Sequence, residues 1–178
     1  MIVLFNKPYG VLCQFTDEDG RETLKDYIDI PNIYAAGRLD KDSEGLLLLT
    51  DDGKLNNKLT NPKNKSYKTY LVQVENEISD EQIKQLEQGV MLKDGMTLPA
   101  IVKKIEQPNW LWNRVPPIRE RKNIPTSFIL ISIKEGRNRQ VRRMSAAVGC
   151  PTLRLIRTDI GEYKLDNLRS GEYKIIPK

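Results

Sequence analysis

The sequence predicts an α+β fold built on a largely antiparallel mixed β-sheet with flanking helices. Two observations support this class: short apolar segments bounded by turn residues dominate the chain, and helical patterns are few. No internal repeat is visible, and 178 residues suffice for one domain with a real core or for two small lobes that share a cleft. The polar connection Lys63–Ser66 is the best candidate for a boundary. We therefore expect one domain, 1–178, with possible lobes at about 1–65 and 66–178.

The predicted strands are short runs of apolar residues that end at turn-forming residues. They cover residues 2–5, 34–36, 46–50, 68–75, 127–134 and 151–157, with a last strand between 161 and 178. Residues 127–134 are apolar on both faces, which is typical of a central strand. Residues 91–106 are expected to form a β-hairpin around Lys93-Asp94-Gly95. Residues 107–126, with four prolines and both tryptophans, should be an ordered loop.

The predicted helices are marked by capping residues. Thr23 can cap a short helix that reaches Ile28, and Asp51 or Asp52 can cap a helix over 54–59. Ser79 and Gln82 form a capping box for a helix that stops at Gly89. A last helix is predicted over 139–148, followed by Gly149.

Composition excludes several classes of chemistry. The chain has no histidine, so histidine triads, histidine–metal sites and imidazole acid–base catalysis are excluded. Cys13 and Cys150 form no disulfide framework, and they indicate free thiols in a reducing compartment. The N-terminus does not resemble a signal peptide, and no apolar run is long enough to span a membrane. We expect a cytoplasmic protein.

Positive charge is concentrated in one segment. Residues 114–157 hold 11 Lys or Arg and 2 Asp or Glu, which leaves 18 of the 29 basic and 22 of the 24 acidic residues to the rest of the chain. A basic segment within a mildly acidic body indicates a partner with a phosphate backbone. The alternative is a solvated surface.

The stretch Gly37–Gly53 (GRLDKDSEGLLLLTDDG) surrounds a run of four leucines with five carboxylates. Turns favour Asp, Ser and Gly, which accounts for the acids on either side of the leucine run but not for Arg38-Leu39-Asp40. We predict that Asp40 is a catalytic carboxylate. The alternatives are a turn with solvated acids, a calcium loop and a magnesium site on Asp40 and Asp42. The calcium loop is rejected because Asp51 is shorter than the glutamate such loops need and no helix can precede Asp40.

The stretch Glu135–Met144 (EGRNRQVRRM) predicts a second cluster. At helical spacing Arg139, Arg142 and Arg143 lie on adjacent turns, either as a solvated face or as a phosphate grip with one arginine turned toward Asp40. An arginine beside a carboxylate keeps it ionised. Tyr70 alone would be a sheet aromatic, but in a cleft its ring could stack on an unpaired base.

In this order the motifs GRLDxDSxGLLLLTxDG, KxY, EGRNRQVRRM, LRLIR and GEY resemble the bacterial ribosomal-RNA pseudouridine synthases of the RsuA/RluB/RluE/RluF group. The resemblance runs from about Leu4 to Tyr173. The stretch PPIRERKNIPTS and the end LDNL…GEY most resemble the RluE branch, which acts on the large subunit. Many members carry an N-terminal S4 RNA-binding domain, whereas we expect this chain to begin at the catalytic domain without an S4 domain. The basic segment 114–157 would then have to bind the RNA.

The resemblance implies the pseudouridine synthase catalytic fold with a central RNA-binding cleft, and isomerisation of uridine to pseudouridine without a cofactor or metal. Asp40 would be the essential carboxylate, by attack on the base, attack on C1′ or removal of a ribose proton. Arg142 would pair with Asp40, Tyr70 would pack against the flipped base, Leu155 would support the pocket and Arg38 would hold the nucleotide. The further RNA contacts expected from the basic segment are Arg119, Arg121, Arg137, Arg139 and Arg143.

The partner expected from these features is 23S ribosomal RNA, as a stem-loop or a partly assembled large subunit, bound by a monomer without membrane contact. Two other classes of function stay open. A non-catalytic protein that binds ribosomal RNA or assists ribosome assembly would show the same basic segment. A metal-dependent nuclease or phosphotransferase could use Asp40 and Asp42, and it would lose activity in a chelator.

Overall fold

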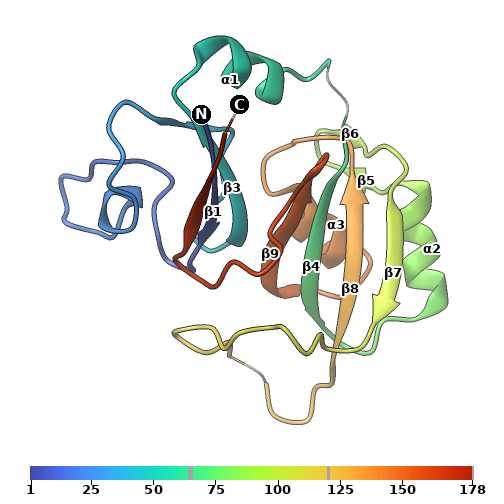
Figure 1. Ribbon diagram of the computed structural model, residues 1–178. Helices are drawn as coiled ribbons and strands as arrows, with labels where there is room; N and C mark the ends of the chain where they lie inside the picture. The colour runs from blue at the N-terminus through green and yellow to red at the C-terminus, as the bar shows by residue number, and fades with distance from the viewer. Residues whose placement is uncertain (64–65, 120, 178) are drawn as a thin grey trace. The chain divides into compact units, whose positions relative to one another are not determined.

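The computed structural model describes residues 1–63, 66–119 and 121–177, and the chain forms two compact units (Figure 1). The first unit comprises Met1–Asn64 with Arg157–Lys178, and the second comprises Lys65–Ile156. Each unit combines β-strands with short helices around an apolar core of its own. The predicted α+β class is therefore confirmed. Within the described residues, no helix is both long enough and apolar enough to cross a membrane.

The first unit is built on two buried strands. β1 (Ile2–Lys7) pairs with β3 (Glu44–Thr50) on one side and with β11 (Tyr173–Ile176) on the other, antiparallel in both cases. β2 (Tyr34–Ala36) pairs with the end of β3. Every residue of β1 and β3 is buried, because both strands have apolar side chains on both faces and neighbours on both edges. The run of four leucines is thus the centre of this unit.

Two short helices complete the first unit. Leu24–Asp26 forms the 3₁₀ helix η1 behind a capping box at Thr23, and α1 (Gly53–Thr60) is capped by the side chain of Asp52. η1 contributes to an apolar core beside β1 and β3 (Val3, Phe5, Val11, Leu24, Ile28, Ile33, Leu39, Leu47, Leu49).

In the second unit, the strand order is β9, β4, β8, β7. β8 (Thr126–Ile133) lies between β4 (Lys68–Glu75) and β7 (Ile101–Ile105), antiparallel to both, as its apolar pattern predicts. β9 (Thr152–Ile160) lies beside β4 and continues past Ile156 into the first unit.

Helices α2 (Asp80–Gln88) and α3 (Gln140–Ala147) cover one face of these strands (Figure 1). Their apolar residues join those of the strands in one core (Val72, Val74, Ile78, Leu86, Ala100, Val102, Ile129, Ile131, Ile133, Val141, Met144, Cys150, Leu155). Burial in this core raises the pKa of the Cys150 thiol.

Two predicted elements differ from the structure. The hairpin expected over 91–106 is limited to β5 (Met91–Leu92) and β6 (Gly95–Met96), while β7 pairs with β8 instead. The helix expected from Arg139 begins at Gln140, because Arg139 adopts a left-handed conformation with φ of 52°. Near the C-terminus β10 (Tyr163–Lys164) pairs with the end of β9.

Candidate functional site

The Asp40 loop is anchored on both sides by buried residues. Leu39 is 6% exposed in the core of the first unit, and Ser43 begins the buried segment that continues into β3. Between them Asp40 is half-buried and Arg38 is exposed. The amide of Ser43 donates to the carbonyl oxygen of Asp40 over 3.0 Å, which closes the turn. This geometry fixes the backbone of a half-buried carboxylate in the turn that precedes β3.

Lys7, at the end of β1, is fully buried and binds the chain next to Asp40. Its Nζ donates to the carbonyl oxygens of Pro8 and Val11 over 2.8 Å each and to that of Lys41 over 3.4 Å. Burial lowers the pKa of Lys7 to about 8, against the opposing effect of nearby acids that include Asp40. A buried cation therefore holds the residue that follows Asp40.

Arg157 holds the other side of the same loop. Its guanidinium is buried, with Nε donating to the carbonyl oxygen of Leu46 over 2.8 Å and Nη1 to that of Arg38 over 3.4 Å. Its Nη2 is buried and has no hydrogen-bond partner within the part of the chain that the structure describes. Lys7 and Arg157 thus bind backbone carbonyls on either side of Asp40.

Gly45 allows Arg157 to approach this closely. The residue has φ of +108°, and a Cβ placed on it would lie 2.2 Å from the carbonyl oxygen of Arg157 and 2.6 Å from its nitrogen. Real Cβ atoms do not approach backbone so closely, so only glycine fits between β3 and β9 here.

The second unit brings three predicted site residues to one core. Tyr70 on β4 packs against that core, and Leu155 on β9 belongs to it with 7% exposure. Arg142 lies half-buried on α3, between the core residues Val141 and Met144. The elements that carry Tyr70, Leu155 and Arg142 therefore all contribute residues to one apolar core. Asp40 and Arg38 belong to the first unit.

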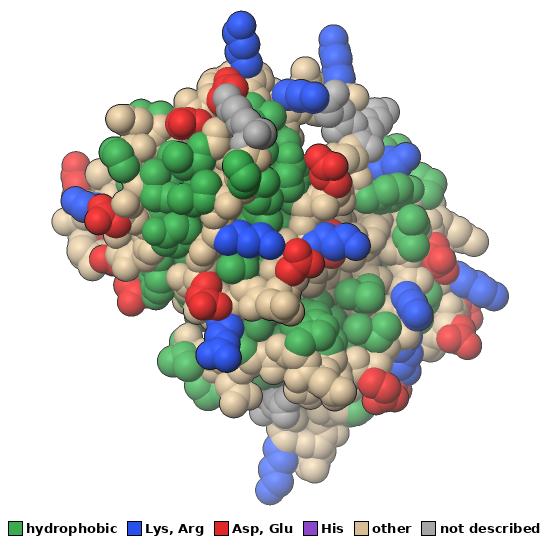
Figure 2. Space-filling view, viewed as in Figure 1, with side chains coloured by type: hydrophobic (Ala, Val, Ile, Leu, Met, Phe, Trp, Pro, Cys, Tyr) green, Lys and Arg blue, Asp and Glu red, His purple; other side chains and the backbone are tan. Residues whose placement is uncertain are grey.

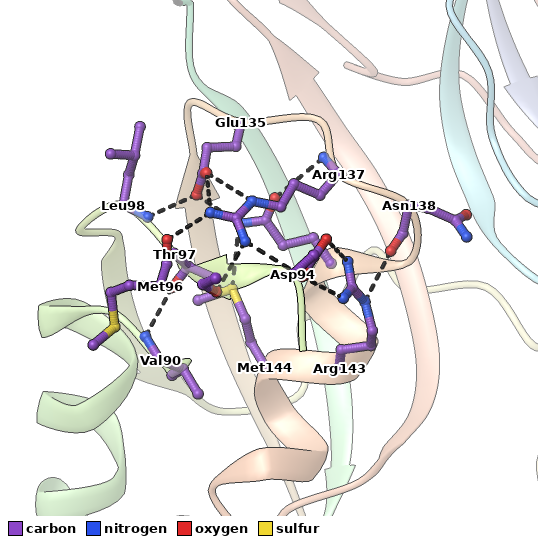
Figure 3. A network of polar contacts seen from close by, with 12 residues as sticks. Val90, Asp94, Met96, Thr97, Leu98, Glu135, Arg137, Asn138, Arg143 and Met144 are labelled. Atoms are coloured by element: carbon purple, nitrogen blue, oxygen red, sulfur yellow. Dashed lines mark hydrogen bonds and ion pairs between the residues drawn. The ribbon is translucent and has the colours of Figure 1, made fainter. Parts of the chain in front are cut away.

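A polar network fixes the segment before α3 (Figure 3). The Arg137 guanidinium donates to Glu135 over 3.0 Å, to the carbonyl oxygen of Gly95 over 3.0 Å and to the carbonyl oxygen of Met96. It also forms an ion pair with Asp94, with 3.4 Å between Nη1 and Oδ1. Arg137, predicted to contact RNA, thus ties its own loop to the β5–β6 hairpin.

Arg143 joins the same network through Asp94. Its Nη1 and Nη2 donate to the two oxygens of Asp94 over 2.8 and 3.2 Å, and its Nε donates to the carbonyl oxygen of Asn138 over 3.0 Å. The hydrogen bond from Arg143 lowers the pKa of the Asp94 carboxyl below its usual value. Glu135 completes the network by accepting from Gln140 and from the amide of Leu98.

The remaining predicted RNA contacts lie at the surface. Arg119 and Arg139 are exposed, and Arg121 is exposed but donates to Glu75 over 2.7 and 3.0 Å. Because Arg139 precedes α3 in a left-handed conformation, it does not share a helical face with Arg142 and Arg143, and the predicted three-arginine helix face is wrong.

Sequence reasoning missed Lys7 and Arg157. Both are charged residues that follow an apolar run within a strand, Lys7 after LFN and Arg157 after LRLI, and that position was the available signal. Across residues 1–63, 66–119 and 121–177, no three Cys, Asp or Glu side chains gather as metal ligands would.

Residues 1–147 match the protein family described as RNA pseudouridylate synthase. Over 175 residues the chain is 57% identical to ribosomal large subunit pseudouridine synthase E of Vibrio parahaemolyticus, which covers 98% of this chain and 73% of that protein. It is 52% identical over 177 residues to the Xanthomonas campestris protein of the same name, and this match covers 98% of this chain and 95% of that protein. A crystal structure of a pseudouridylate synthase superposes with a TM-score of 0.79 at 31% identity, covering 99% of this chain and 70% of that one.

These matches define the class of protein: the chain belongs to the RNA pseudouridylate synthase family. Its fold is the fold of that family. The four relatives at 52 to 57% identity all have the name ribosomal large subunit pseudouridine synthase E.

Proposed function

We propose that this protein isomerises a uridine of large-subunit ribosomal RNA to pseudouridine in the bacterial cytoplasm. The observation that carries the proposal is the 57% identity, over 98% of this chain, to a protein named for that activity. Residues 1–178 act as one catalytic domain. The substrate is 23S ribosomal RNA, as a stem-loop or a partly assembled subunit, and the enzyme acts as a monomer.

The reaction is balanced without a cofactor or an oxidant. The bond between C1′ and N1 of the uracil breaks, the base turns, and a bond forms between C1′ and C5. The hydrogen on C5 leaves as a proton, while N1 gains one. The protein has to supply a carboxylate, a proton route and a site that holds the detached base.

Asp40 is the essential carboxylate of this proposal. Its support is the geometry of the loop, in which Lys7 binds the carbonyl of Lys41 and Arg157 binds the carbonyl of Arg38. Such a loop holds the backbone of Asp40 in place before substrate arrives, so the loop is ordered during folding and not during binding.

The other residues are assigned the roles that their positions in the family motifs imply. Arg142 pairs with Asp40, Tyr70 packs against the flipped base, Leu155 supports the pocket and Arg38 holds the nucleotide. Leu155 belongs to the apolar core of the second unit and Tyr70 packs against it, and apolar surroundings of this kind suit a base that must leave its stack. Exposed arginines of the basic segment, Arg119 and Arg139 among them, bind phosphates and offset the cost of flipping, a few kcal/mol.

The test uses ribosomal RNA transcribed with uridine tritiated at C5, because isomerisation releases that tritium to water. Wild type should release one tritium per target uridine, and Asp40→Asn should release none while retaining its melting temperature and its affinity for the RNA. Asp42→Asn, two residues further along the same loop, is the matched control and should retain activity.

Two results would sink the proposal. If Asp40→Asn releases tritium at the wild-type rate, the catalytic assignment is wrong. If wild type binds the RNA without releasing tritium from free RNA or from partly assembled subunits, the protein is an RNA-binding protein without this activity. The same assay is repeated with a metal chelator present. A metal-dependent nuclease would stop cleaving the RNA, whereas this enzyme should release tritium at an unchanged rate.

A further inference from the structure

Trp110 is a large apolar side chain on the surface of the second unit. It is 54% exposed, whereas its neighbour Trp112 is half-buried. The two indole rings lie 6.1 Å apart between centroids and are tilted by 40°. Trp112 therefore supports one edge of Trp110 and leaves the rest of its ring open.

The loop around Trp110 is held in place by buried and half-buried arginines. Arg154, only 6% exposed, donates from Nη1 to the carbonyl oxygen of Trp112 over 2.9 Å, and its guanidinium lies 5.7 Å from the centre of the Trp112 ring. Arg114 donates to the carbonyl oxygens of Pro116 and Pro117 over 2.8 and 3.3 Å. The exposure of Trp110 is thus a built feature of an anchored loop.

The same loop is positively charged. Residues 107–125 contain four Lys or Arg and one Glu, and of these basic residues Arg119, Arg121 and Lys122 are exposed, with Arg121 paired to Glu75. Hydrophobic and basic side chains are both visible at the lower end of Figure 2, where Figure 1 places this loop. An open aromatic ring in the same loop as exposed cations matches the two parts of a nucleotide, a flat base and a phosphate.

We propose that Trp110 is a stacking site for an unpaired base of the RNA, separate from the base that is isomerised. The proposal rests on the proposed function, because it takes RNA as the ligand. Arg154, which anchors Trp112, precedes Leu155 on β9, so the stacking site is tied to the strand that carries a residue of the proposed pocket. Trp110 thereby fixes the position of a single-stranded nucleotide that flanks the target.

The probes are a twelve-nucleotide oligouridylate and a twelve-base-pair RNA duplex, each titrated against the full chain. Stacking on an aromatic ring contributes roughly 1–3 kcal/mol per base, so Trp110→Ala should weaken oligouridylate binding about 5- to 150-fold. Trp110→Phe keeps a π-face and should restore most of that loss. Duplex binding should not change, since its bases are already stacked.

The matched control is Val115→Ala, which truncates a side chain of the same loop that is 82% exposed. It should leave both affinities unchanged. The dependence of affinity on salt is a second measurement: Trp110→Ala should keep the wild-type slope, because it removes no phosphate contact. Equal affinity of Trp110→Ala and wild type for oligouridylate would overturn the proposal, as would an equal loss on oligouridylate and duplex.

The two proposals fail separately. Loss of oligouridylate binding in Trp110→Ala, in a protein that releases no tritium from ribosomal RNA, supports the stacking site and rejects the isomerase. Normal tritium release together with unchanged binding by Trp110→Ala rejects the stacking site alone.

Discussion

The absence of a side chain at Gly45 allows Arg157 to approach β3 and to anchor the Asp40 loop. Its Cβ position is occupied by the backbone of Arg157, whose guanidinium binds the carbonyls of Arg38 and Leu46. A substitution that moves this backbone also moves an anchor of the Asp40 loop. The glycine is therefore required by the loop as well as by the sheet.

Gly45→Ala should lower the free energy of unfolding by about 2 kcal/mol or more, because it combines a backbone clash with a φ that disfavours a side chain. Gly53→Ala is the control, since a Cβ there meets nothing within 4 Å and the residue begins α1. That variant should stay within about 1 kcal/mol of wild type. Urea unfolding measures both, and equal stability of the two variants would contradict the steric argument.

Lys7 makes stability depend on pH in a defined direction. Its pKa is about 8 in the folded protein and 10.5 in the unfolded chain. Between these values the unfolded state holds more protons, so stability rises with pH. The stability of wild type relative to Lys7→Met should therefore increase by up to about 3 kcal/mol from pH 8 to 10.5. A relative stability that stays flat over this window, measured by urea unfolding, would show that Lys7 is not desolvated.

At the scale of elements, the network of Asp94, Glu135, Arg137 and Arg143 joins the β5–β6 hairpin to the segment before α3. Neither part has much regular structure of its own, because β5 and β6 have two residues each. Their order depends on guanidinium–carboxylate and guanidinium–carbonyl contacts. Since α3 carries Arg142, the network also supports a residue of the proposed site.

Arg137→Ala should raise amide hydrogen exchange in residues 95–98 by at least about tenfold, because it removes hydrogen bonds from a charged donor to Gly95 and Met96. Lys93→Ala removes an exposed cation from the same hairpin and should leave exchange unchanged. Mass spectrometry of peptides covering residues 90–98 reports the difference. Similar exchange in both variants would show that the network does not order the hairpin.

The elements also show where sequence reasoning works. The strands at 34–36 and 68–75 were predicted with their observed bounds, since alternation and turn residues mark them locally. The prediction of one hairpin over 91–106 was wrong because a strand pattern in the sequence does not show which strand it pairs with. In the structure β7 pairs with β8. The hydrogen-bond partners of Lys7 and Arg157 could not be predicted, because they are backbone carbonyls brought close only by the fold.

At the scale of the whole molecule, the arginines of the basic segment 114–157 fall into two groups: some contact the protein itself, and others are proposed to bind RNA. Arg154 and Arg157 are buried, and Arg121, Arg137 and Arg143 bind carboxylates of the protein. Much of the charge that predicts an RNA partner therefore stabilises the protein itself. Net charge along a sequence indicates a class of partner, but not which cations meet it.

Arg119→Ala should lower affinity for ribosomal RNA and reduce the slope of log K against log salt by roughly 0.7–0.9, the value of one phosphate contact. Lys103→Ala removes an equal charge from an exposed position on β7 and should keep the wild-type slope. Filter binding between 50 and 200 mM salt, roughly the range over which such slopes are read, gives both values. Identical slopes would place Arg119 outside the RNA contact.

The first unit is assembled from both ends of the chain: β11 pairs with β1, and Arg157 reaches the carbonyls beside Asp40. On a translating ribosome the Asp40 loop emerges early but has to wait for more than a hundred further residues before its anchor exists. A nascent chain that has not yet reached Arg157 therefore has an Asp40 loop without this anchor.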